Sequence, residues 1–482
     1  MKLSELLRGM SDVRIVGSAK DREITRVTDD SRTVADDSVI FFVRRGHTSD
    51  GAMFVPDAIR RGCRVFLSER GLSLPPDCTQ ILCKFGLKAS AEIAMRCFDH
   101  PEKQLFFVGI TGTKGKTTTA FFLTHLLRFA GERVASVGTL GVDLGGEIRK
   151  TENTTPSLFV LLPIFSEFVR RGIRTVVMEV SSQALADGRV FGIPFSLGIF
   201  TSFFPDHIGT TEHRDLAEYT AAKRSLFSSY HMNTVIVNDD DAAAAYMVSD
   251  VPRKIFCSTG HPADVRAYCL FADRRGTRFS VDDATGEIAL IGKCHLMNAL
   301  LALAAANRLT GEAIGDLLPA LKGLGVPGRF ERVEHGGRVF IIDYAHNGES
   351  VRKIAQTVRE LYDGRRVAVF GSVGGRGEMR RYLLSRAAEA CMDFSVITSD
   401  DPGTEDALGI CAELYAHFSD KTRAKIIVDR AEAIRYAYRI SKPGDVILLL
   451  GKGHEIYQKT IKGNLPFSEK NILASLDNPA RV

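Results

Sequence analysis

The sequence predicts an α/β protein with three domains, and three observations support this prediction. Short apolar runs alternate with helical patterns along most of the chain, as in parallel sheets covered by helices. A length of 482 residues exceeds what one hydrophobic core normally holds. Polar, glycine-rich loops follow the apolar runs. We expect a small N-terminal α/β domain over residues 1–100, a central domain with a mostly parallel sheet over 101–325, and a C-terminal doubly wound, Rossmann-like domain over 326–482.

Composition narrows the functional classes. Lys and Arg number 63 against 58 Asp and Glu, so the net charge of +5 is too small to favour nucleic acid or a membrane surface as a partner. The nine cysteines include no C-x-x-C pair, which argues against a disulfide framework and a structural zinc site. No signal-peptide segment and no apolar run of about 18 residues occurs. We expect a cytoplasmic protein without nucleic-acid or membrane partners.

The first 100 residues contain strand-like runs at 13–16, 39–43 and 64–67 and a helical pattern at 55–61. Two polar turns accompany them, and their side chains are rich in hydrogen-bonding groups. Because most such turns are merely solvated, they do not by themselves indicate a ligand. These turns contain Asp29, Ser31, His47, Thr48 and Ser49.

Residues 105–130 predict a nucleoside-triphosphate site. An apolar run at 105–110 has the character of a buried strand, and a helical pattern runs from Thr117 to a stop at Gly131. A glycine loop between strand and helix can offer its N–H groups to phosphates, Lys116 can reach the β and γ oxygens, and Thr117 can ligate Mg²⁺. The predicted loop consists of Gly112, Thr113, Lys114, Gly115, Lys116, Thr117 and Thr118.

This loop departs from the strict G-x-x-x-x-G-K-T pattern, because Ile110 stands five positions before Gly115. The alternative is an ordinary glycine-rich turn. The Lys-Thr pair after Gly115 and the flanking strand and helix favour the phosphate site.

The central region continues as a βα repeat, which places ligands at the carboxyl ends of parallel strands. Glu179 ends an apolar run, and Asp206 and His207 follow another. For Glu179 alone, a salt-bridged strand end is an equal alternative. Convergence with the phosphate loop favours a Mg²⁺ ligand. Expected strands are 134–137, 175–180, 197–201 and 234–238, and an expected helix is 158–170.

Three further features of the central region have modest value alone. Lys223 borders an apolar helical stripe, where lysines usually extend to solvent. Residues 278–291 predict a hairpin that turns at 283–286, and 297–309 predict a helix. Asn298, at the expected start of this helix, is either a cap or a ligand.

The C-terminal region predicts a second doubly wound sheet after a linker at 323–330. Four polar loops follow its strands, so they share the carboxyl edge and form a binding face. The loop at 371–377 has only a weak resemblance to a dinucleotide motif. The strands are expected at 339–343, 366–371, 394–399 and 445–450, and the other loops at 343–346, 400–403 and 451–455.

In combination, these motifs resemble the Mur ligase family of peptidoglycan synthesis, most closely the MurE type that adds the third amino acid. The resemblance runs from about Asp29 to Gln458, and such an order of motifs is very improbable by chance. Its motifs are Gly112-Thr-Lys-Gly-Lys-Thr117, Asn153-Thr-Thr155, Glu179-Val-Ser-Ser182, Asp206-His207, Ala222-Lys223, Gly328-Arg329, Asp343-Tyr-Ala-His346, Asp400-Asp-Pro402 and Gly451-Lys-Gly-His-Glu455.

The resemblance implies a monomeric, ATP-dependent ligase that acts on UDP-N-acetylmuramoyl-L-alanyl-D-glutamate through an acyl phosphate, with two Mg²⁺. Asp29, Ser31, His47, Thr48 and Ser49 would hold the uridine diphosphate. Asn153, Thr154, Thr155, Ser181, Asp187 and Arg189 would hold the muramoyl dipeptide. Asn298, Arg329 and Asp343 would join the phosphate loop in binding ATP. Lys116, Thr117, Glu179 and His207 would serve the phosphates and metals.

The resemblance also gives Lys223 a role that sequence pattern alone does not. In relatives the matching lysine is carbamylated by CO₂, which converts a cation into an anionic oxygen ligand. Hard Mg²⁺ prefers oxygen donors, so a carbamate on Lys223 would suit the second metal.

The loop that would select the added amino acid departs from the pattern. Relatives that use meso-diaminopimelate carry Asp-Asn-Pro-Arg, whose arginine grips a distal carboxylate. Here Asp401 and Gly403 replace the amide and the arginine. On charge we favour L-lysine, with meso-diaminopimelate as the alternative if Arg380 or Arg381 reaches in. The expected amino-acid site contains Arg376, Asp400, Asp401, Gly403, Gly451 and Glu455.

Three other functions compete with this one. A different ligase of the superfamily, of the MurF or folylpolyglutamate type, is disfavoured by the N-terminal turns and the C-terminal loops. A non-catalytic nucleotide-binding homologue is disfavoured by the intact Lys116, Glu179 and Lys223. A nucleic-acid motor is disfavoured because the sequence shows neither the basic grooves nor the aromatic platforms that such a protein needs to bind its strand.

Overall fold

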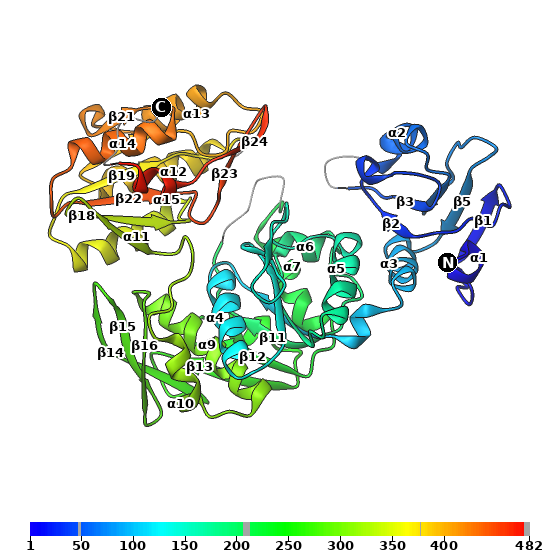
Figure 1. The fold of residues 1–482 in the computed structure, drawn as a ribbon, viewed down its shortest axis with the longest axis horizontal. Helices are drawn as coiled ribbons and strands as arrows, with labels where there is room; N and C mark the ends of the chain where they lie inside the picture. The colour runs from blue at the N-terminus through cyan, green and yellow to red at the C-terminus, as the bar shows by residue number, and fades with distance from the viewer. Residues whose placement is uncertain (47–49, 206–212, 376, 477–482) are drawn as a thin grey trace. The chain divides into compact units, whose positions relative to one another are not determined.

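The structure, a computed structural model, describes residues 1–46, 50–205, 213–375 and 377–476. The chain divides into two compact units, each of which is considered by itself. The first contains residues 1–266 and 297–317, and the second contains 267–296 and 318–482. Both are α/β, which confirms the predicted fold class (Figure 1).

The N-terminal sheet has the strand order β1-β5-β4-β3-β2. Four strands are parallel, and β1 pairs antiparallel at one edge. Every side chain of β3 is buried, as the continuous apolar run in its sequence requires. The strands are β1 (Val13–Gly17), β2 (Arg26–Thr28), β3 (Val39–Val43), β4 (Val65–Ser68) and β5 (Thr79–Cys83), and the helices are α1 (Leu3–Leu6), α2 (Val55–Arg60) and α3 (Gly86–Cys97).

The central sheet contains six parallel strands in the order β13-β12-β11-β6-β10-β7. From β6 the chain passes to β7 on one side and later to β11 on the other, so ligands are expected at the carboxyl end of β6. The strands are β6 (Phe106–Thr111), β7 (Val134–Gly138), β10 (Thr175–Glu179), β11 (Phe195–Phe200), β12 (Thr234–Asn238) and β13 (Arg253–Ser258), extended antiparallel by β8 (Gly141–Asp143) and β9 (Ile148–Arg149). The helices are α4 (Lys116–Phe129), α5 (Leu158–Arg170), α6 (Ser182–Ala186), α7 (Leu216–Ser228) and α8 (Ala244–Met247).

Two expectations for residues 278–309 need correction. The predicted hairpin forms from β15 (Gly276–Val281) and β16 (Ala284–Ile288), but it turns at Asp282–Asp283 rather than at 283–286. Asp282 has a φ of +50°, a conformation that Asp tolerates better than most residues. Helix α9 (Lys293–Thr310) begins four residues earlier than expected, directly after Gly292. The remaining elements here are β14 (Val265–Asp273) and α10 (Ile314–Leu317).

The C-terminal sheet has the order β17-β18-β22-β19-β20-β21, with only β17 antiparallel. This pattern confirms the doubly wound prediction. The strands are β17 (Glu331–His335), β18 (Arg338–Asp343), β19 (Arg366–Phe370), β20 (Phe394–Ile397), β21 (Ala424–Ile426) and β22 (Val446–Leu450). The helices are α11 (Gly348–Leu361), α12 (Glu378–Cys391), α13 (Ala407–Ala416), α14 (Arg430–Ile440) and α15 (Glu469–Ala474), and β23 (Tyr457–Thr460) with β24 (Gly463–Pro466) forms a separate hairpin.

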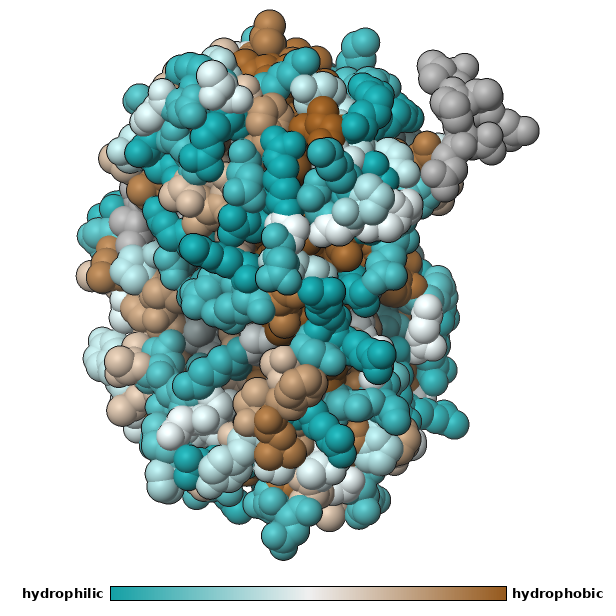
Figure 2. All heavy atoms as spheres, turned by 90° about the vertical axis from the view of Figure 1, so that its left-hand side faces the viewer, coloured by the Kyte–Doolittle hydropathy of each residue, from teal (hydrophilic) through white to brown (hydrophobic). Residues whose placement is uncertain are grey.

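Among the described residues, no helix has both the length and the apolar character of a membrane span. Figure 2 shows one face on which hydrophilic side chains dominate and the hydrophobic ones lie in small scattered groups.

Candidate active site

The loop between β6 and α4 has the geometry of a phosphate-binding loop. Gly112 and Gly115 have φ values of +153° and +94°, which favour glycine. A Cβ on Gly112 would overlap Thr201 and Ser202, and one on Gly115 would overlap the Asn298 side chain. Asn298 lies inside α9, so the cap alternative is wrong. Its carboxamide instead packs against the loop.

Two lysines converge on this loop. Lys116 Nζ donates to the carbonyl oxygens of Gly112 at 2.8 Å and of Thr113 at 3.3 Å. Lys223 Nζ donates to the same Gly112 carbonyl at 2.8 Å and lies 4.7 Å from the centroid of the Tyr219 ring. Lys223 is 2% exposed, so the expectation that it extends to solvent is wrong. The two ammonium groups create a local positive charge that suits a polyphosphate.

Oxygen donors gather around Glu179 at the end of β10. Thr117 Oγ1 donates to Glu179 Oε2 at 2.9 Å, and Thr139 donates to the carboxylate through its N–H at 2.8 Å and its hydroxyl at 3.1 Å. In the described part of the chain no basic side chain pairs with Glu179, which removes the salt-bridged alternative. Such hard oxygen ligands fit Mg²⁺. His207, the other expected metal ligand, lies outside the described residues.

Thr139 is a member of this network that the sequence did not identify. Its hydroxyl also lies 3.1 Å from Thr154 Oγ1, so the predicted dipeptide loop contacts the predicted metal site. The sequence signal for Thr139 is weak, because a single threonine directly after the end of a strand, here Gly138, is common. The remaining loop residues Thr113, Lys114 and Thr118 belong to the same phosphate loop, and Lys114 N–H donates to Ser202 Oγ at 3.0 Å.

The predicted dipeptide residues also meet. Thr155 Oγ1 donates to the Glu179 carbonyl at 2.9 Å and accepts from the Ser181 N–H at 3.0 Å. Ser181 caps α6 by accepting from the Ala184 N–H. Asn153 accepts from Thr151 through its carbonyl oxygen at 3.0 Å. These contacts join the 153–155 loop to the end of β10.

Arg44 connects the predicted uridine site to the predicted dipeptide site. Its Nε lies 3.4 Å from Asp29 Oδ2, and its Nη1 donates to the Asp187 carbonyl at 2.9 Å. The Asp187 carboxylate in turn pairs with Arg189 at 2.7 Å. Burial raises the pKa of Asp29, and the charge of Arg44 opposes that rise. Arg44 belongs to none of the predicted motifs, although it directly follows the buried strand β3 and precedes a polar turn.

Other N-terminal predictions have separate outcomes. Ser31 Oγ donates to Asp57 Oδ2 at 2.8 Å, so its hydroxyl is engaged within the N-terminal sheet's loops. His47, Thr48 and Ser49 lie outside the described residues.

In the second unit, four side chains form what we call the amino-acid cluster: Asp400, Asp401, Lys452 and Glu455. Lys452 is fully buried, and its Nζ lies 2.7 Å from Asp401, 2.5 Å from Glu455 and 3.9 Å from Asp400. Burial raises the pKa of Asp400 and Glu455, with Lys452 opposing the rise. Burial acts to lower the pKa of Lys452, but the three carboxylates raise it above its ordinary value. The carboxylate oxygens stand as in a metal site, with the lysine ammonium in the place of the cation.

The glycines beside this cluster differ in what they allow. Gly451 has a φ of +109°, and a Cβ there would overlap the Asp400 carboxylate. Gly403 has a φ of +61°, and a Cβ there would meet nothing within 4 Å. Gly403 therefore leaves open space where a larger side chain would stand.

The two arginines that could replace the missing one differ in their surroundings: Arg380 lies near enough to Asp400 for its charge to oppose the rise in the pKa of that carboxyl, whereas Arg381 is engaged elsewhere. Arg381 is buried and pairs with Glu405 at 2.8 Å and with Glu413. Arg380 donates to the His346 carbonyl at 3.4 Å. Arg376, which was expected at the amino-acid site, lies outside the described residues.

Arg329 and Asp343 meet at one turn of the second unit. Asp343 accepts from the N–H groups of Phe330 at 2.7 Å and Ala345 at 2.8 Å, and thus holds the turn that carries Arg329. The Arg329 guanidinium lies 4.7 Å from the centroid of the Tyr344 ring. Both predicted ATP contacts therefore lie at the carboxyl end of β18.

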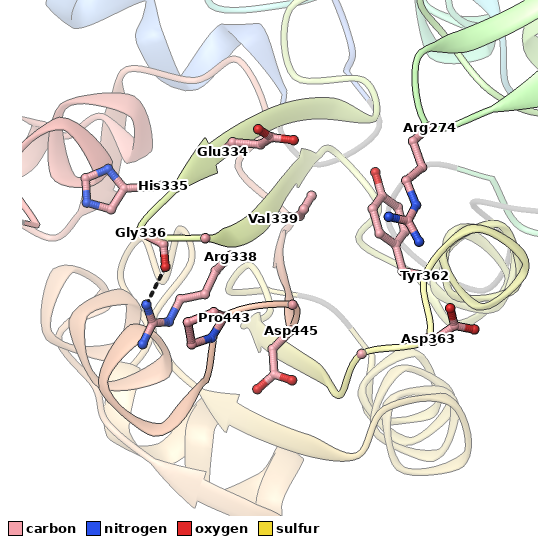
Figure 3. A pocket seen from close by; sticks show the side chains of 13 residues that line it. Arg274, Glu334, His335, Gly336, Arg338, Val339, Tyr362, Asp363, Pro443 and Asp445 are labelled. Atoms are coloured by element: carbon pink, nitrogen blue, oxygen red, sulfur yellow. Dashed lines mark hydrogen bonds between the residues drawn. The ribbon is translucent and has the colours of Figure 1, made fainter.

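A pocket of about 830 Å³ opens at the opposite, amino edge of the same sheet (Figure 3). Its two arginines are engaged with the main chain. Arg338 donates to the carbonyls of Gly336 and Ser441, and Arg274 donates to the Leu361 carbonyl at 2.7 Å. We therefore assign the site to the carboxyl edges.

Comparison with known proteins agrees with this geometry. The family described as "Mur ligase middle domain" matches residues 110–306, and "Mur ligase, glutamate ligase domain" matches 328–453. The chain is 35% identical to a "UDP-N-acetylmuramoyl-L-alanyl-D-glutamate--2,6-diaminopimelate ligase" of Solibacter usitatus, over 98% of this chain and 97% of that one. It is 34% identical to the protein of that name from Caldanaerobacter subterraneus, over 99% of both.

A solved structure with the same name is also similar. It has a TM-score of 0.66 and 25% sequence identity, and the alignment covers 100% of both chains. The three-dimensional likeness therefore extends over all the elements that carry the candidate site.

Proposed function

Since the chain belongs to the Mur ligase family, we propose that it adds meso-diaminopimelate to UDP-N-acetylmuramoyl-L-alanyl-D-glutamate. It is an ATP-dependent ligase that forms an amide bond in peptidoglycan precursor synthesis. The observation that carries the proposal is the placement of two lysines, of which Lys223 is buried, and an oxygen-donor cluster at the carboxyl end of β6.

The chemistry requires two anions to approach each other. In the first step, an oxygen of the D-glutamate side-chain carboxylate attacks the γ-phosphorus of ATP, and ADP leaves. In the second step, the amine of the amino acid attacks the carbonyl carbon of the resulting acyl phosphate. Phosphate leaves, and the amine gives up a proton. Lys116 supplies positive charge where the phosphates bind. Thr117 and Glu179 would hold Mg²⁺, which supplies further neutralisation of the phosphate oxygens.

We propose that Lys223 is carbamylated in the active protein. As an ammonium the buried Lys223 shares the Gly112 carbonyl with the partly buried Lys116, so two positive charges stand close together. Addition of CO₂ to the neutral amine, with loss of a proton, would replace one of these charges with an anion. The carbamate would then be an oxygen ligand for a second Mg²⁺.

The identity of the amino acid is where the proposal differs from the sequence-based expectation. L-lysine was favoured because Asp401 and Gly403 suggested an acidic pocket. The Asp401 carboxylate instead pairs with the buried Lys452 at 2.7 Å, so it is not a free anion. The names of the similar ligases support the alternative, diaminopimelate.

The remaining substrate contacts follow the same logic. Asp29, Arg44, Asp187 and Arg189 form a continuous polar connection, which we assign to the UDP-muramoyl part of the substrate. A non-catalytic homologue would have no need of the two lysines that converge on the phosphate loop. A folylpolyglutamate-type ligase would have no need of the polar connection.

The test is an assay of ADP formation with the purified protein. UDP-N-acetylmuramoyl-L-alanyl-D-glutamate and ATP are combined in parallel with meso-diaminopimelate, L-lysine or L-ornithine. We expect ADP and the tripeptide nucleotide only when all three substrates are present, and fastest with meso-diaminopimelate. ADP formation without dependence on the dipeptide nucleotide would contradict the proposal, as would faster turnover with L-lysine.

A further inference from the structure

The hairpin of β23 and β24, drawn in red in Figure 1, is fastened to the amino-acid cluster through its main chain. The N–H of Lys459 donates to Asp401 Oδ1 at 2.8 Å. The N–H of Gly403 donates to the Lys459 carbonyl at 3.0 Å. Lys459 is therefore held beside the open position at Gly403.

The side chain of Lys459 leaves the hairpin on the face that carries Tyr457. Gln458 points the other way, because its amide donates to the carbonyls of Ser399 at 3.3 Å and Asp400 at 3.0 Å. The centroid of the Tyr457 ring lies 5.3 Å from Lys452 Nζ. Since side chains alternate along a strand, Lys459 shares the face of Tyr457, the side on which the amino-acid cluster lies.

Lys459 also differs from its basic neighbours in its pairing. Lys452 is surrounded by three carboxylates, and Arg381 is held by two. Lys459 is exposed, and within the described chain its ammonium makes no ion pair and no hydrogen bond. It therefore keeps its full capacity to bind an anion. No atom lies within 4 Å of the position that a Cβ on Gly403 would take, so the space beside it is open.

We propose that Lys459 binds the distal carboxylate of the diamino acid and is the residue that selects diaminopimelate over L-lysine. This inference rests on the proposed function. The second carboxylate of diaminopimelate gains a charge-assisted hydrogen bond from the ammonium. L-lysine has no such carboxylate and brings its own ammonium towards Lys459, so the same residue disfavours it by repulsion of like charges.

The test compares Lys459→Ala and Lys459→Glu with the matched control Lys462→Ala. Lys462 is an exposed lysine in the turn of the same hairpin. KM and kcat are measured with meso-diaminopimelate and with L-lysine. We expect Lys459→Ala to raise the KM for meso-diaminopimelate about tenfold or more, as for loss of a hydrogen bond to a charged group. The KM values for ATP and the dipeptide nucleotide should not change.

L-lysine provides the second half of the test. Its KM should stay the same or fall in Lys459→Ala, and fall further in Lys459→Glu, where an anion replaces the cation. Lys462→Ala should behave as the native protein with both amino acids. An active Lys459→Ala protein with an unchanged KM for meso-diaminopimelate overturns this inference alone.

Two results with the native protein bear on the proposed function itself. Failure to ligate any diamino acid removes the proposed function and this inference together. A native KM for L-lysine below that for meso-diaminopimelate removes the selectivity that we assign to Lys459, while leaving the ligase activity in place.

Discussion

The carboxyl edges of the central and C-terminal sheets are built alike but carry opposite patterns of charge. At the central edge two lysines, the partly buried Lys116 and the buried Lys223, point at one backbone carbonyl. At the C-terminal edge one buried lysine, Lys452, faces three carboxylates. Parallel topology places polar loops at such edges in both sheets, whatever their charge.

This difference shows what each edge is ready to bind. Positive charge at the central edge lies against the backbone carbonyls of the phosphate loop, which suits the binding of an anion. The C-terminal edge already contains its own cation, which three carboxylates share. A metal ion would have to displace Lys452 from this position.

Replacement of Lys223 should have the largest effect. Lys223→Ala should lower kcat by about a thousandfold or more, because the edge loses a group that acts on developing charge. Phosphate release measures this. Arg224→Ala is the control, since Arg224 forms a partly exposed ion pair with Asp250.

Small carboxylates separate a carbamate from a lysine ammonium. If Lys223 acts as a carbamate, formate or acetate should partly restore the activity of Lys223→Ala, whereas methylammonium should not. Rescue by the amine alone would contradict the carbamate while preserving the need for Lys223.

Lys452→Met tests how much the buried lysine of the amino-acid cluster stabilises the C-terminal edge. Removal of one partner from a buried charged group typically costs about 3–5 kcal/mol, so the free energy of unfolding should fall by that amount at pH 8. Because the pKa of Lys452 is raised in the folded protein, its pairing contributes its full stabilisation below the ordinary pKa of 10.5. This stabilisation is lost as the pH rises through the pKa that Lys452 has in the folded protein.

The stability of Lys452→Met should depend on pH in a definite direction. The pKa values of Asp400 and Glu455 already lie above their ordinary 3.8 and 4.5, and loss of Lys452 should raise them further. The folded variant then binds more protons than the unfolded chain, so its stability should recover as the pH falls from 8 to 5.5. Urea denaturation at both pH values, with Lys462→Met as the control, measures the effect. Equal losses at both pH values would contradict the charge argument.

Arg44 is intermediate between the lysines of the central edge, which contact carbonyls, and Lys452, which contacts carboxylates. Its guanidinium contacts one carboxylate and one carbonyl. Arg44→Ala should weaken binding of the UDP-muramoyl dipeptide about tenfold, as for loss of hydrogen bonds to charged groups. Titration calorimetry measures this, with Arg45→Ala as the control because the Arg45 side chain is 81% exposed. Equal affinities of the two variants would remove Arg44 from the substrate site.

Sequence periodicity predicted most of the strands because buried parallel strands are continuous apolar runs. β3, α5 and β12 have the predicted bounds. The two-residue β9 and the polar hairpin β23–β24 gave no such signal, since their residues are mostly exposed.

The candidate site was predicted unevenly for a related reason. Motifs located the phosphate loop, whose residues are adjacent in the chain. The burial of Lys223 depends on a contact with Gly112, 111 positions away, and the neutralisation of Asp401 depends on Lys452, 51 positions away. Local sequence patterns do not indicate such long-range pairs. The surroundings predicted for Lys223 and for Asp401 were therefore wrong.

Asp401→Asn should have the smallest effect. An asparagine Oδ1 can still accept from the Lys459 N–H and from Lys452 Nζ, so stability should change by less than about 1 kcal/mol. Loss of one anion should lower the pKa of Asp400, since the charge of Asp401 contributes to its rise, and should slightly lower the KM for meso-diaminopimelate. A destabilisation as large as that of Lys452→Met would mean that the full charge of Asp401, rather than its position as an acceptor, balances the buried lysine. In that case the C-terminal edge depends on net charge as the central edge does, and the contrast between them is one of sign alone.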